Sequence, residues 1–469
     1  MAEVAPRQQI DVFVIGSGPA GQKAAIQAAK AGRSVVLCEQ LREIGGACVQ
    51  FGTIPSKTLR ERALDRARAR ALLDHGNPTV RPVTGINIAE LIGETDELLR
   101  RHDEYMRRQL LRNGIELAHG RAAFESADQL SVRGVDGTLT RYQCDAVIIA
   151  TGSAPRTPPN VAVDHEHIYD SDSILSIGYL PQTMLVLGGG VIACEYASIF
   201  ALLGVEVIQI DRFPMPLGFL DAELSAQFRL AFEQNGGRFI GPVELTEVRV
   251  LEPGRVVAEL ADGRTIEAEK AFCALGRESQ VKGLALDQAG LATDERGLIP
   301  VTEEGRTLVP QIFAAGDVVG PPSLASTSMQ QGRRAARALL DMDPGDRWTL
   351  TPIGIYAVPE LGSIGLTEVQ ARTAGNEVVV GLARFDEIAR GLINGMDAGI
   401  LKLVADTEGR LLGAHVAGGP ATELVHLAQL ALLQDATVDL FVDHVFNFPT
   451  YAEAYRVAAL DVLAQLKNR

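Results

Sequence analysis

One pattern, a strand, a glycine-rich turn, a helix and a second strand, occurs twice in the chain and restricts its fold more than any other feature. The copies read "IDVFVIGSGPAGQKAAIQAAKAGRSVVLCEQ" and "MLVLGGGVIACEYASIFALLGVEVIQIDR". Each turn has the spacing G-x-G-x-x-G or G-x-G-x-x-A, formed by Gly16, Gly18 and Gly21 in the first copy and by Gly188, Gly190 and Ala193 in the second. An acidic residue, Glu39 or Asp211, ends the second strand at the same distance from the first glycine in both copies. The repeat predicts an α/β protein with two Rossmann-like domains.

Each copy has the chemistry of a dinucleotide site. The first glycine permits a tight turn, the second lets backbone N–H groups approach a pyrophosphate, and the third position lets helix and strand pack closely. The helix N-terminus adds unpaired N–H groups and a partial positive charge. Glu39 and Asp211 lie where a carboxylate can accept hydrogen bonds from ribose hydroxyls. We expect two dinucleotides, of which only one need be a resident cofactor.

Charge and hydropathy exclude several other classes. The net charge of −15, with no basic stripe to offset it, argues against a general nucleic-acid binder. The run "RERALDRARARALLDH" from Arg60 is interrupted by acidic residues and predicts a solvated helix face. The apolar stretch 184–210 contains glycines and two glutamates, so it predicts a strand, turn, helix and strand rather than a membrane span.

The cysteines favour a reducing compartment. There are five, scattered and without the spacing of metal ligands, so no metal site is expected. Four of them are expected to be buried as small apolar side chains: Cys38, Cys144, Cys194 and Cys273. The first nine residues lack the apolar centre of a signal peptide, and a cytoplasmic protein is expected.

Two further segments indicate which dinucleotide the first of the two glycine motifs binds. "AVIIATGSAPR" (146–156) predicts a buried strand that ends in a turn at Thr151 and Gly152, and "IFAAGDVVG" (312–320) a short strand that ends at Gly316 and Asp317. A helix over about 325–340 would begin close to whatever Asp317 contacts, and its N-terminal dipole could stabilise negative charge there. With the two glycine motifs, these segments resemble the FAD-dependent pyridine nucleotide–disulfide oxidoreductases, the family of lipoamide dehydrogenase and glutathione reductase.

This resemblance covers residues 10 to about 466 and implies a domain layout. Two Rossmann-like domains, for FAD and for NAD(H) or NADP(H), would be followed by a C-terminal α+β domain that forms a homodimer, beginning near "TPIGIYAVPELGSIGLTE" (351–368). The implied boundaries are 1–155 and 281–349 for the two parts of the FAD-binding and central region, 156–280 for the NAD(P)-binding domain and 350–469 for the dimer-interface domain.

The same resemblance implies roles for individual residues. Asp317 would hold the ribityl chain of FAD, and Lys57 and Glu195 would form an ion pair beside the flavin edge that receives hydride, instead of lying on the surface as solvated charges. Asp211, followed by Arg212, could serve both NAD and NADP, since an acid binds ribose hydroxyls and an arginine balances a 2′-phosphate; an ion pair of Asp211 with a helix end is the alternative. Further cofactor contacts are implied at Gly46, Gly120 and Gly276.

The chain departs from the family in its redox-active thiols. Where the family has GGxCxxxGCIPSK, this sequence reads "GGACVQFGTIPSK", with Cys48 present and Thr53 in the place of the second cysteine. Near the C-terminus Phe448 stands where the family has a histidine that exchanges protons with thiols, and His444 nearby is expected to be structural. Both changes remove parts of a dithiol mechanism, while Lys57 and Glu195 remain.

One branch of the family shares this combination. The segments "GTIPSKTLRE", "GPPSLASTSMQQGR" and "FNFPTYAEAYRVAALD" resemble the soluble, Si-specific pyridine nucleotide transhydrogenases. That resemblance implies hydride transfer from NADPH to NAD+ through tightly bound FAD, without a redox disulfide. A diaphorase or quinone reductase, a dihydrolipoamide dehydrogenase with an unusual thiol, and a flavin-binding structural subunit are the alternatives.

Overall fold

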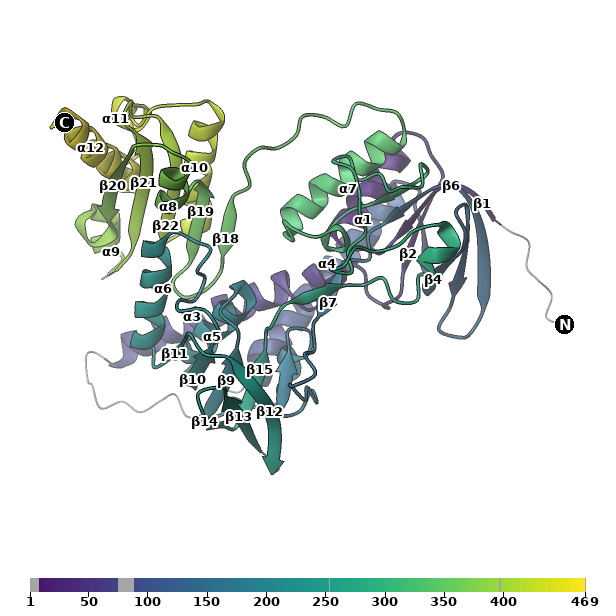
Figure 1. Cartoon of the computed structure of the whole chain (residues 1–469), viewed down its shortest axis with the longest axis horizontal. Helices are drawn as coiled ribbons and strands as arrows, with labels where there is room; N and C mark the ends of the chain where they lie inside the picture. Colours follow the sequence, from purple (N-terminus) through teal and green to yellow (C-terminus); the bar gives the residue numbers. More distant parts are fainter. Residues whose placement is uncertain (1–7, 75–87, 253, 396–397, 469) are drawn as a thin grey trace.

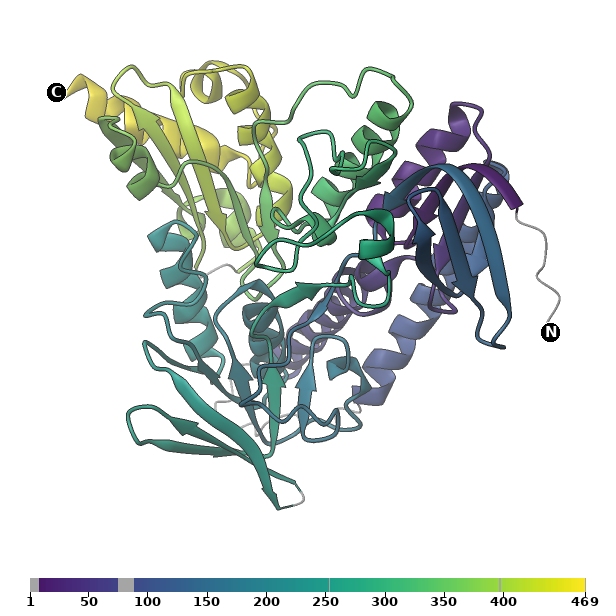
Figure 2. The ribbon, with the colours of Figure 1, turned by 45° about the vertical axis from the view of Figure 1, so that its right-hand side comes forward.

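The computed structural model describes residues 8–74, 88–252, 254–395 and 398–468 (Figure 1). Residues 1–7, most of the segment in which we expect no signal peptide, and His75, the end of the basic run, lie outside the described residues. Three sheets of five or more strands surround a central group of helices, as Figures 1 and 2 show from two sides. The first glycine motif belongs to one sheet, the second to another, and the C-terminal segment forms the third.

The first sheet combines parallel and antiparallel strands in the order β3-β2-β1-β6-β5-β4, and β17 also pairs with β6. Its strands are β1 (Gln8–Ile15), β2 (Val35–Glu39), β3 (Glu116–His119), β4 (Arg121–Ser126), β5 (Gln129–Arg133), β6 (Leu139–Ile149) and β17 (Ile312–Ala314). One face packs against α1 (Pro19–Lys30), α4 (Ile88–Arg112) and α7 (Ala325–Leu339). Because β17 joins from late in the chain, the polypeptide leaves this sheet, builds the second and returns.

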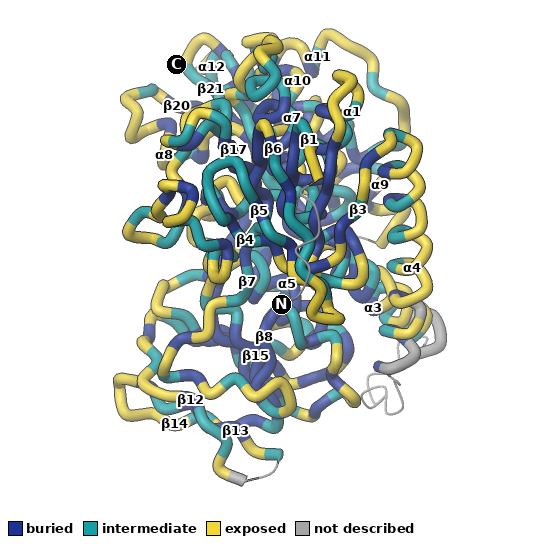
Figure 3. Tube along the Cα trace, turned by 90° about the vertical axis from the view of Figure 1, so that its right-hand side faces the viewer, coloured by how far each residue is buried: buried dark blue, intermediate teal, exposed yellow. Residues whose placement is uncertain are grey.

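The small side chains of the alanine-rich helix α1 allow α7 to pack closely against it. A Cβ at Gly332 of α7 would lie 2.0 Å from the Ala20 carbonyl oxygen of α1, so only glycine fits at this contact. The helices α2 (Gly46–Gln50) and α3 (Thr53–Asp74) follow the first motif. The outer side of α4 is exposed while the strands are buried (Figure 3).

The second sheet is entirely parallel, in the order β11-β10-β9-β15-β8. Its strands are β8 (Ile168–Asp170), β9 (Thr183–Leu187), β10 (Glu206–Ile210), β11 (Arg238–Ile240) and β15 (Lys270–Cys273), and its helices are α5 (Val191–Leu202) and α6 (Ala222–Gln234). An antiparallel sheet of β12 (Leu245–Glu252), β13 (Arg255–Leu260) and β14 (Thr265–Ala268) packs against it. The expected strand, turn, helix and strand over 184–210 is confirmed by β9, α5 and β10.

Helix α5 is apolar on nearly every side because it is enclosed on every side. Its residues 193–201 are buried in one core cluster with Leu59 of α3, Phe272 of β15 and Ala357 of the C-terminal segment. A helix that is hydrophobic all round belongs in a core rather than at a surface. Glu195, the only charged residue in α5, is therefore placed between the second sheet, the third sheet and α3.

The third sheet is antiparallel, in the order β18-β19-β22-β21-β20. Its strands are β18 (Ile353–Ile355), β19 (Leu361–Gly365), β20 (Val378–Arg384), β21 (Ile400–Asp406) and β22 (Leu411–Ala417), and its helices are α8 (Glu368–Thr373), α9 (Ala389–Ile393), α10 (Ala421–Leu433), α11 (Leu440–Asp443) and α12 (Glu453–Lys467). The segment 351–368, near which this domain is expected to begin, contains the two strands β18 and β19. A small two-stranded sheet, β7 (Ser153–Pro155) with β16 (Arg277–Ser279), joins the first and second sheets.

The basic run from Arg60 is only partly a solvated face. Glu61 and Arg62 are exposed, but the expectation is wrong for Arg60, which is buried. Its Nε donates to the Ala357 carbonyl at 2.9 Å, and its guanidinium lies 3.3 Å from the Glu360 carboxylate. The contact ties α3 to the C-terminal segment, and no local pattern in the run indicates it.

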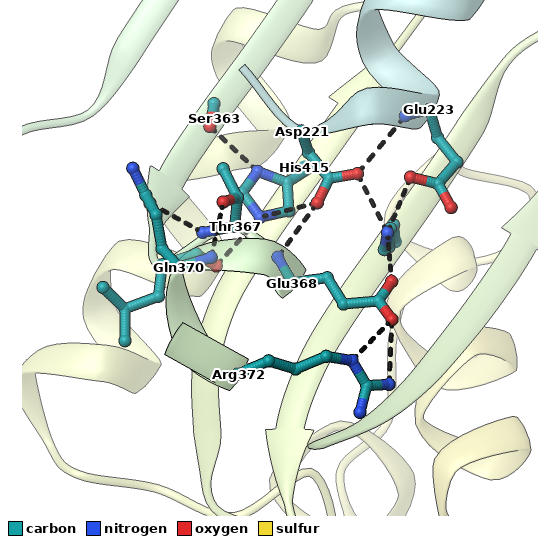
Figure 4. A network of polar contacts seen from close by, with 10 residues as sticks. Asp221, Glu223, Ser363, Thr367, Glu368, Gln370, Arg372 and His415 are labelled. Carbon is teal, nitrogen blue, oxygen red and sulfur yellow. Dashed lines mark hydrogen bonds and ion pairs between the residues drawn. The ribbon is translucent and has the colours of Figure 1, made fainter. Parts of the chain in front are cut away.

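A buried polar cluster joins the second and third sheets (Figure 4). Lys402 of β21, 1% exposed, donates to three carboxylates, those of Asp221, Glu223 and Glu368, at 2.7–2.9 Å. Asp221 is the N-cap of α6, and Glu368 begins α8. Burial opposes the charge of Lys402, but the hydrogen bonds to these carboxylates raise its pKa. We name this group of residues the Lys402 cluster.

Candidate active site

The first glycine loop is bound to the loop that carries Cys48. Ser17 donates its hydroxyl to the Glu39 carboxylate at 2.6 Å and accepts the Gly45 N–H at 2.9 Å. Gly46 has φ +61°, and a Cβ there would lie 2.8 Å from the Cα of Gly18. The two loops can approach only because both positions are glycine.

These residues fit a bound FAD. Gly18 caps α1 without any side-chain hydrogen bond to the helix end, which leaves backbone N–H groups available for a pyrophosphate. A Cβ at Gly16 would lie 2.3 Å from the Ala150 carbonyl oxygen, so the turn reaches the end of β6. There the hydroxyl of Thr151 is buried with no hydrogen-bond partner among the described residues. A polar ligand along the loop would supply that partner.

The other residues predicted to contact FAD lie in separate segments of the first glycine domain. Glu39, at the end of β2, is buried and also accepts N–H groups from Ser17 and Leu41. Gly120 donates its N–H to the Glu39 carbonyl at 2.8 Å, and Gly152 follows Thr151 in a turn with φ +71°. Gly316 has φ +85° and donates its N–H to Gln331 of α7 at 2.8 Å.

Asp317 is held by a chain of polar contacts that no sequence motif indicates. Ser153 donates its hydroxyl to the Asp317 carboxylate at 2.7 Å and accepts the Nε of Arg277 at 2.9 Å. Arg277 also donates to Ser171 at 2.9 Å. Gly276 precedes it with φ +107°, which glycine tolerates and which lets β16 pair with β7. Asp317 is thereby fixed from the second glycine domain as well as from its own.

The second glycine loop fits a nicotinamide dinucleotide. Gly190 caps α5 without any side-chain hydrogen bond, and Ala193 is fully buried in its first turn. A Cβ at Gly189 would lie 2.6 Å from Oδ2 of Asp211, so the carboxylate at the end of β10 sits directly against the loop. Gly188 has φ +112°, which permits the tight turn.

The Asp211 carboxylate accepts the Phe213 N–H at 2.8 Å. Within the described residues it has no ion-pair partner, which removes the helix-end alternative for them. Arg212 lies over the Phe213 ring, 4.9 Å from its centroid. One carboxylate and one guanidinium are therefore consecutive in the chain directly after β10.

Lys57 and Glu195 form an ion pair of 2.7 Å between α3 and α5. The Glu195 side chain is 5% exposed, and its second oxygen accepts the Tyr356 N–H at 2.9 Å. The Lys57 ammonium lies 5.0 Å from the centroid of the Tyr356 ring. Tyr356, from the C-terminal segment, thus contacts both members of the pair, a role that no sequence motif signals.

Cys48 lies close to this pair but has the character of a thiol rather than a thiolate. It is half-buried, and burial raises its pKa. A hydrogen bond with the Thr53 side chain and the charge of Lys57 oppose that shift without cancelling it. The other four cysteines are buried, as expected. Within the described residues, no group of three or more His, Cys, Asp or Glu side chains is placed to hold a metal ion.

The raised pKa of Cys48 predicts that its alkylation by iodoacetamide is slow at neutral pH and accelerates at alkaline pH. The raised pKa leaves little thiolate at pH 7, and the thiolate is the reactive form. Peptide mass spectrometry of the folded protein between pH 6 and 10 measures the rate. A reaction already at its plateau at pH 7 would contradict the prediction.

Phe448 and His444 lie on the surface of the single chain. Phe448 is 69% exposed, and His444 is exposed with its Nδ1 near the Leu440 carbonyl at 3.1 Å. In the part of the chain that the structure describes, no hydrogen bond joins His444 to Cys48 or Lys57. The histidine at the end of α11 therefore has a structural contact.

Two models of known protein families match the chain, one over its larger N-terminal part and one over its C-terminal domain. A family model described as "Pyridine nucleotide-disulphide oxidoreductase" matches residues 10–332, and the model of that family's dimerisation domain matches residues 351–459. The chain belongs to this family. Its fold is accordingly α/β, with two Rossmann-like dinucleotide-binding domains and a C-terminal α+β domain, and family membership implies FAD and NAD(P) as its cofactors.

Relatives match over almost the entire length. The chain is 41% identical to "Soluble pyridine nucleotide transhydrogenase" of Mycobacterium tuberculosis (strain ATCC 25177 / H37Ra) over 463 residues, which is 98% of both chains. It is 38% identical to the protein of the same name from Yersinia pestis (strain Pestoides F), over 97% of this chain and 98% of that one.

Solved structures of the family have the same architecture. LpdA from Mycobacterium tuberculosis superposes with a TM-score of 0.88 at 25% identity, over 96% of this chain and 99% of that one. The HOCl-induced flavoprotein disulfide reductase RclA from Escherichia coli gives a TM-score of 0.86 at 25% identity, over the same shares. Among the described helices, none is both long and apolar enough to cross a membrane.

Proposed function

We propose that this enzyme is a pyridine nucleotide transhydrogenase that moves a hydride from NADPH to NAD+ through bound FAD, without a redox disulfide. The observation that carries the proposal is that Thr53 stands where a second cysteine would face Cys48, while the Lys57–Glu195 pair is intact at 2.7 Å. The transhydrogenase names of relatives at 38–41% identity over nearly the whole chain support it.

In this proposal, some residues of the chain would bind FAD and others would place a positive charge beside it. Bound FAD would supply the chemistry of hydride transfer between two nicotinamides, so no thiol would be required. The first glycine loop, Thr151 and Asp317 would hold it. Lys57 would place a positive charge beside it, and Glu195, fixed by the Tyr356 N–H, keeps that ammonium in one position.

One nicotinamide site serves both substrates in turn in this proposal. Asp211 would bind the ribose hydroxyls of NAD, and Arg212 would neutralise the 2′-phosphate of NADP. The two side chains are adjacent in sequence and are not paired with each other among the described ion pairs. A site built for only one nucleotide needs only one of them.

The dimerisation domain indicates a homo-oligomer, and we propose a homodimer in the cytoplasm. Large apolar side chains are exposed on the C-terminal domain of the single chain, among them Leu430, Leu433, Val445 and Phe448. A second copy that packs against this domain would cover them.

Stopped-flow absorbance of the flavin tests the function. The protein is reduced with NADPH or with NADH, and each reduced sample is then mixed with NAD+ or NADP+. We expect fast reduction by NADPH and fast reoxidation by NAD+. Flavin that both nucleotides reduce, but that only a quinone or dye reoxidises, would replace the proposal with a diaphorase.

The disulfide-free mechanism yields a prediction for T53C. Because the Thr53 side chain hydrogen-bonds the Cys48 thiol, a sulfur at position 53 would lie within reach of it. Treatment of T53C with diamide is expected to remove a pair of titratable thiols and join the two peptides in mass spectrometry. T53S, which keeps the hydroxyl, is the control and loses none. Turnover of dihydrolipoamide by the unmodified protein would overturn the disulfide-free mechanism.

A further inference from the structure

The C-terminal end of α7 carries a cluster of arginines that the catalytic site does not use. A pocket of about 410 Å³ forms where the chain leaves α7 and runs toward β18, a connection visible in Figure 1. It is lined by Gln330, Arg333, Arg334 and Arg337 of α7 and by residues 344–348, which include Arg347 and Trp348. None of these residues belongs to either glycine loop or to the Lys57–Glu195 pair.

The charge of this pocket is one-sided. Four guanidinium groups line it against one carboxylate, that of Asp346, in a chain whose net charge is −15. The sequence of α7, ASTSMQQGRRAARAL, contains three arginines and no acidic residue. Arg333 and Arg337 are separated by one helical turn on the same face, and like charges in that relation repel each other. A bound anion would relieve this repulsion.

Arg334 and Arg347 make contacts that stabilise the fold, whereas Arg333 and Arg337 have few polar contacts or none among the described residues. Arg334 is buried, and its Nη1 donates to the carbonyls of Gly345 and Asp346, which fixes the wall of the pocket. Arg347 is paired with Glu303 at 2.9 Å. Arg333 has one described hydrogen bond, to Gln330 at 2.9 Å.

Arg337 is the most unusual of the four. Its Nε is buried and has no hydrogen-bond partner, and no described ion pair includes its guanidinium. A buried N–H group of a cation without an acceptor is costly, and such groups in native proteins normally have a partner. Arg337 lines the pocket, so an anion bound there can pair with its guanidinium.

We propose that this pocket is a binding site for a small phosphate-bearing anion, separate from the catalytic site. Two guanidinium groups one turn apart match the oxygens of adjacent phosphates, as in a pyrophosphate group, because each can donate two parallel hydrogen bonds. Arg333 and Arg337 lie 8 and 12 residues after Ala325, which places them about 12 and 18 Å from the N-terminal end of α7 at roughly 1.5 Å per residue.

The chain provides its own probe for the test. Trp348 is the only tryptophan, it lines the pocket, and the Arg334 guanidinium lies 5.8 Å from the centroid of its ring. Inorganic pyrophosphate is titrated into the FAD-loaded, full-length protein while tryptophan fluorescence and binding heat are recorded. A saturable change that weakens as salt is added is expected. Parallel titrations with ADP and with citrate distinguish a nucleotide phosphate and a carboxylate from the free anion.

Two variants locate the binding. R337Q and R333Q are each expected to lower the affinity for pyrophosphate at least tenfold, while R264Q, an exposed arginine in the β13–β14 turn, leaves it unchanged. The flavin content of each variant verifies its fold. Saturation by ADP with the same dependence on Arg337 supports the proposal and identifies a nucleotide as a ligand. No saturable change, an affinity of R337Q and R333Q equal to that of the unmodified protein, or binding of citrate alone would overturn it.

Discussion

Replacement of Lys57 by methionine is expected to slow the reduction of bound FAD by NADPH roughly a hundredfold, the usual cost of removing one charge-stabilising group from an active site. Methionine keeps the length of the side chain and removes only the ammonium that Glu195 holds at 2.7 Å. The loss should appear in the rate of reduction at saturating NADPH, measured by stopped-flow absorbance, with little change in the affinity for NADPH.

A second lysine in the same domain provides the control. Lys30, exposed at the end of α1, has no described contact with the site, so K30M should reduce at the normal rate. E195Q tests the other half of the pair. It keeps the shape of the side chain but loses the charge that fixes Lys57, so we expect an intermediate decrease. If K57M reduced as fast as K30M, Lys57 would have no electrostatic role in the reaction.

The sequence predicted the parts of the site that depend on local patterns. Both glycine turns follow a strand and open a helix, because the spacing of glycines and the change from β-branched to alanine-rich sequence are local signals. The pairing of Lys57 with Glu195, which are 138 residues apart, was inferred only from family resemblance.

The residues that support the site could not be predicted in the same way. Tyr356 contacts Glu195 through its backbone N–H, which no side-chain pattern reveals. Ser153 acts between Asp317 and Arg277 because two strands from different domains pair there. Arg60 lies in a run that is otherwise exposed, and its burial follows from the approach of the C-terminal segment. Each contact depends on the packing of distant segments.

Lys402 is also a residue whose burial could not be predicted from the local sequence. In the sequence it interrupts the apolar strand "ILKLVAD", where a lysine usually marks a solvent-facing position. The structure buries residues 400–405 on both faces, because α6 and α8 bring carboxylates to the lysine side. The charge is retained in the interior because its partners arrive from two other elements.

Replacement of Lys402 by methionine is therefore expected to lower the free energy of unfolding by about 3–5 kcal/mol, the range for removing one partner of a buried ion pair. Burial alone would raise the pKa of Asp221, but its hydrogen bonds in the Lys402 cluster hold the pKa at about 2. Without the ammonium, the Asp221 carboxylate, 2% exposed, loses the cation that lies 2.9 Å from it. Guanidinium unfolding of the FAD-saturated protein, followed by circular dichroism, measures the loss.

Lys270 is a matched control for this prediction. It is also buried, at 5% exposed, but it donates to the Glu166 carbonyl and has no described ion pair. K270M should cost about 1 kcal/mol, the contribution of one hydrogen bond. The double variant K402M/D221N should recover part of the loss, because Glu223 and Glu368 are partly exposed and can turn toward water. If K402M and K270M cost the same, the three carboxylates add nothing beyond burial, and the cluster does not hold α6 against the third sheet through its charge.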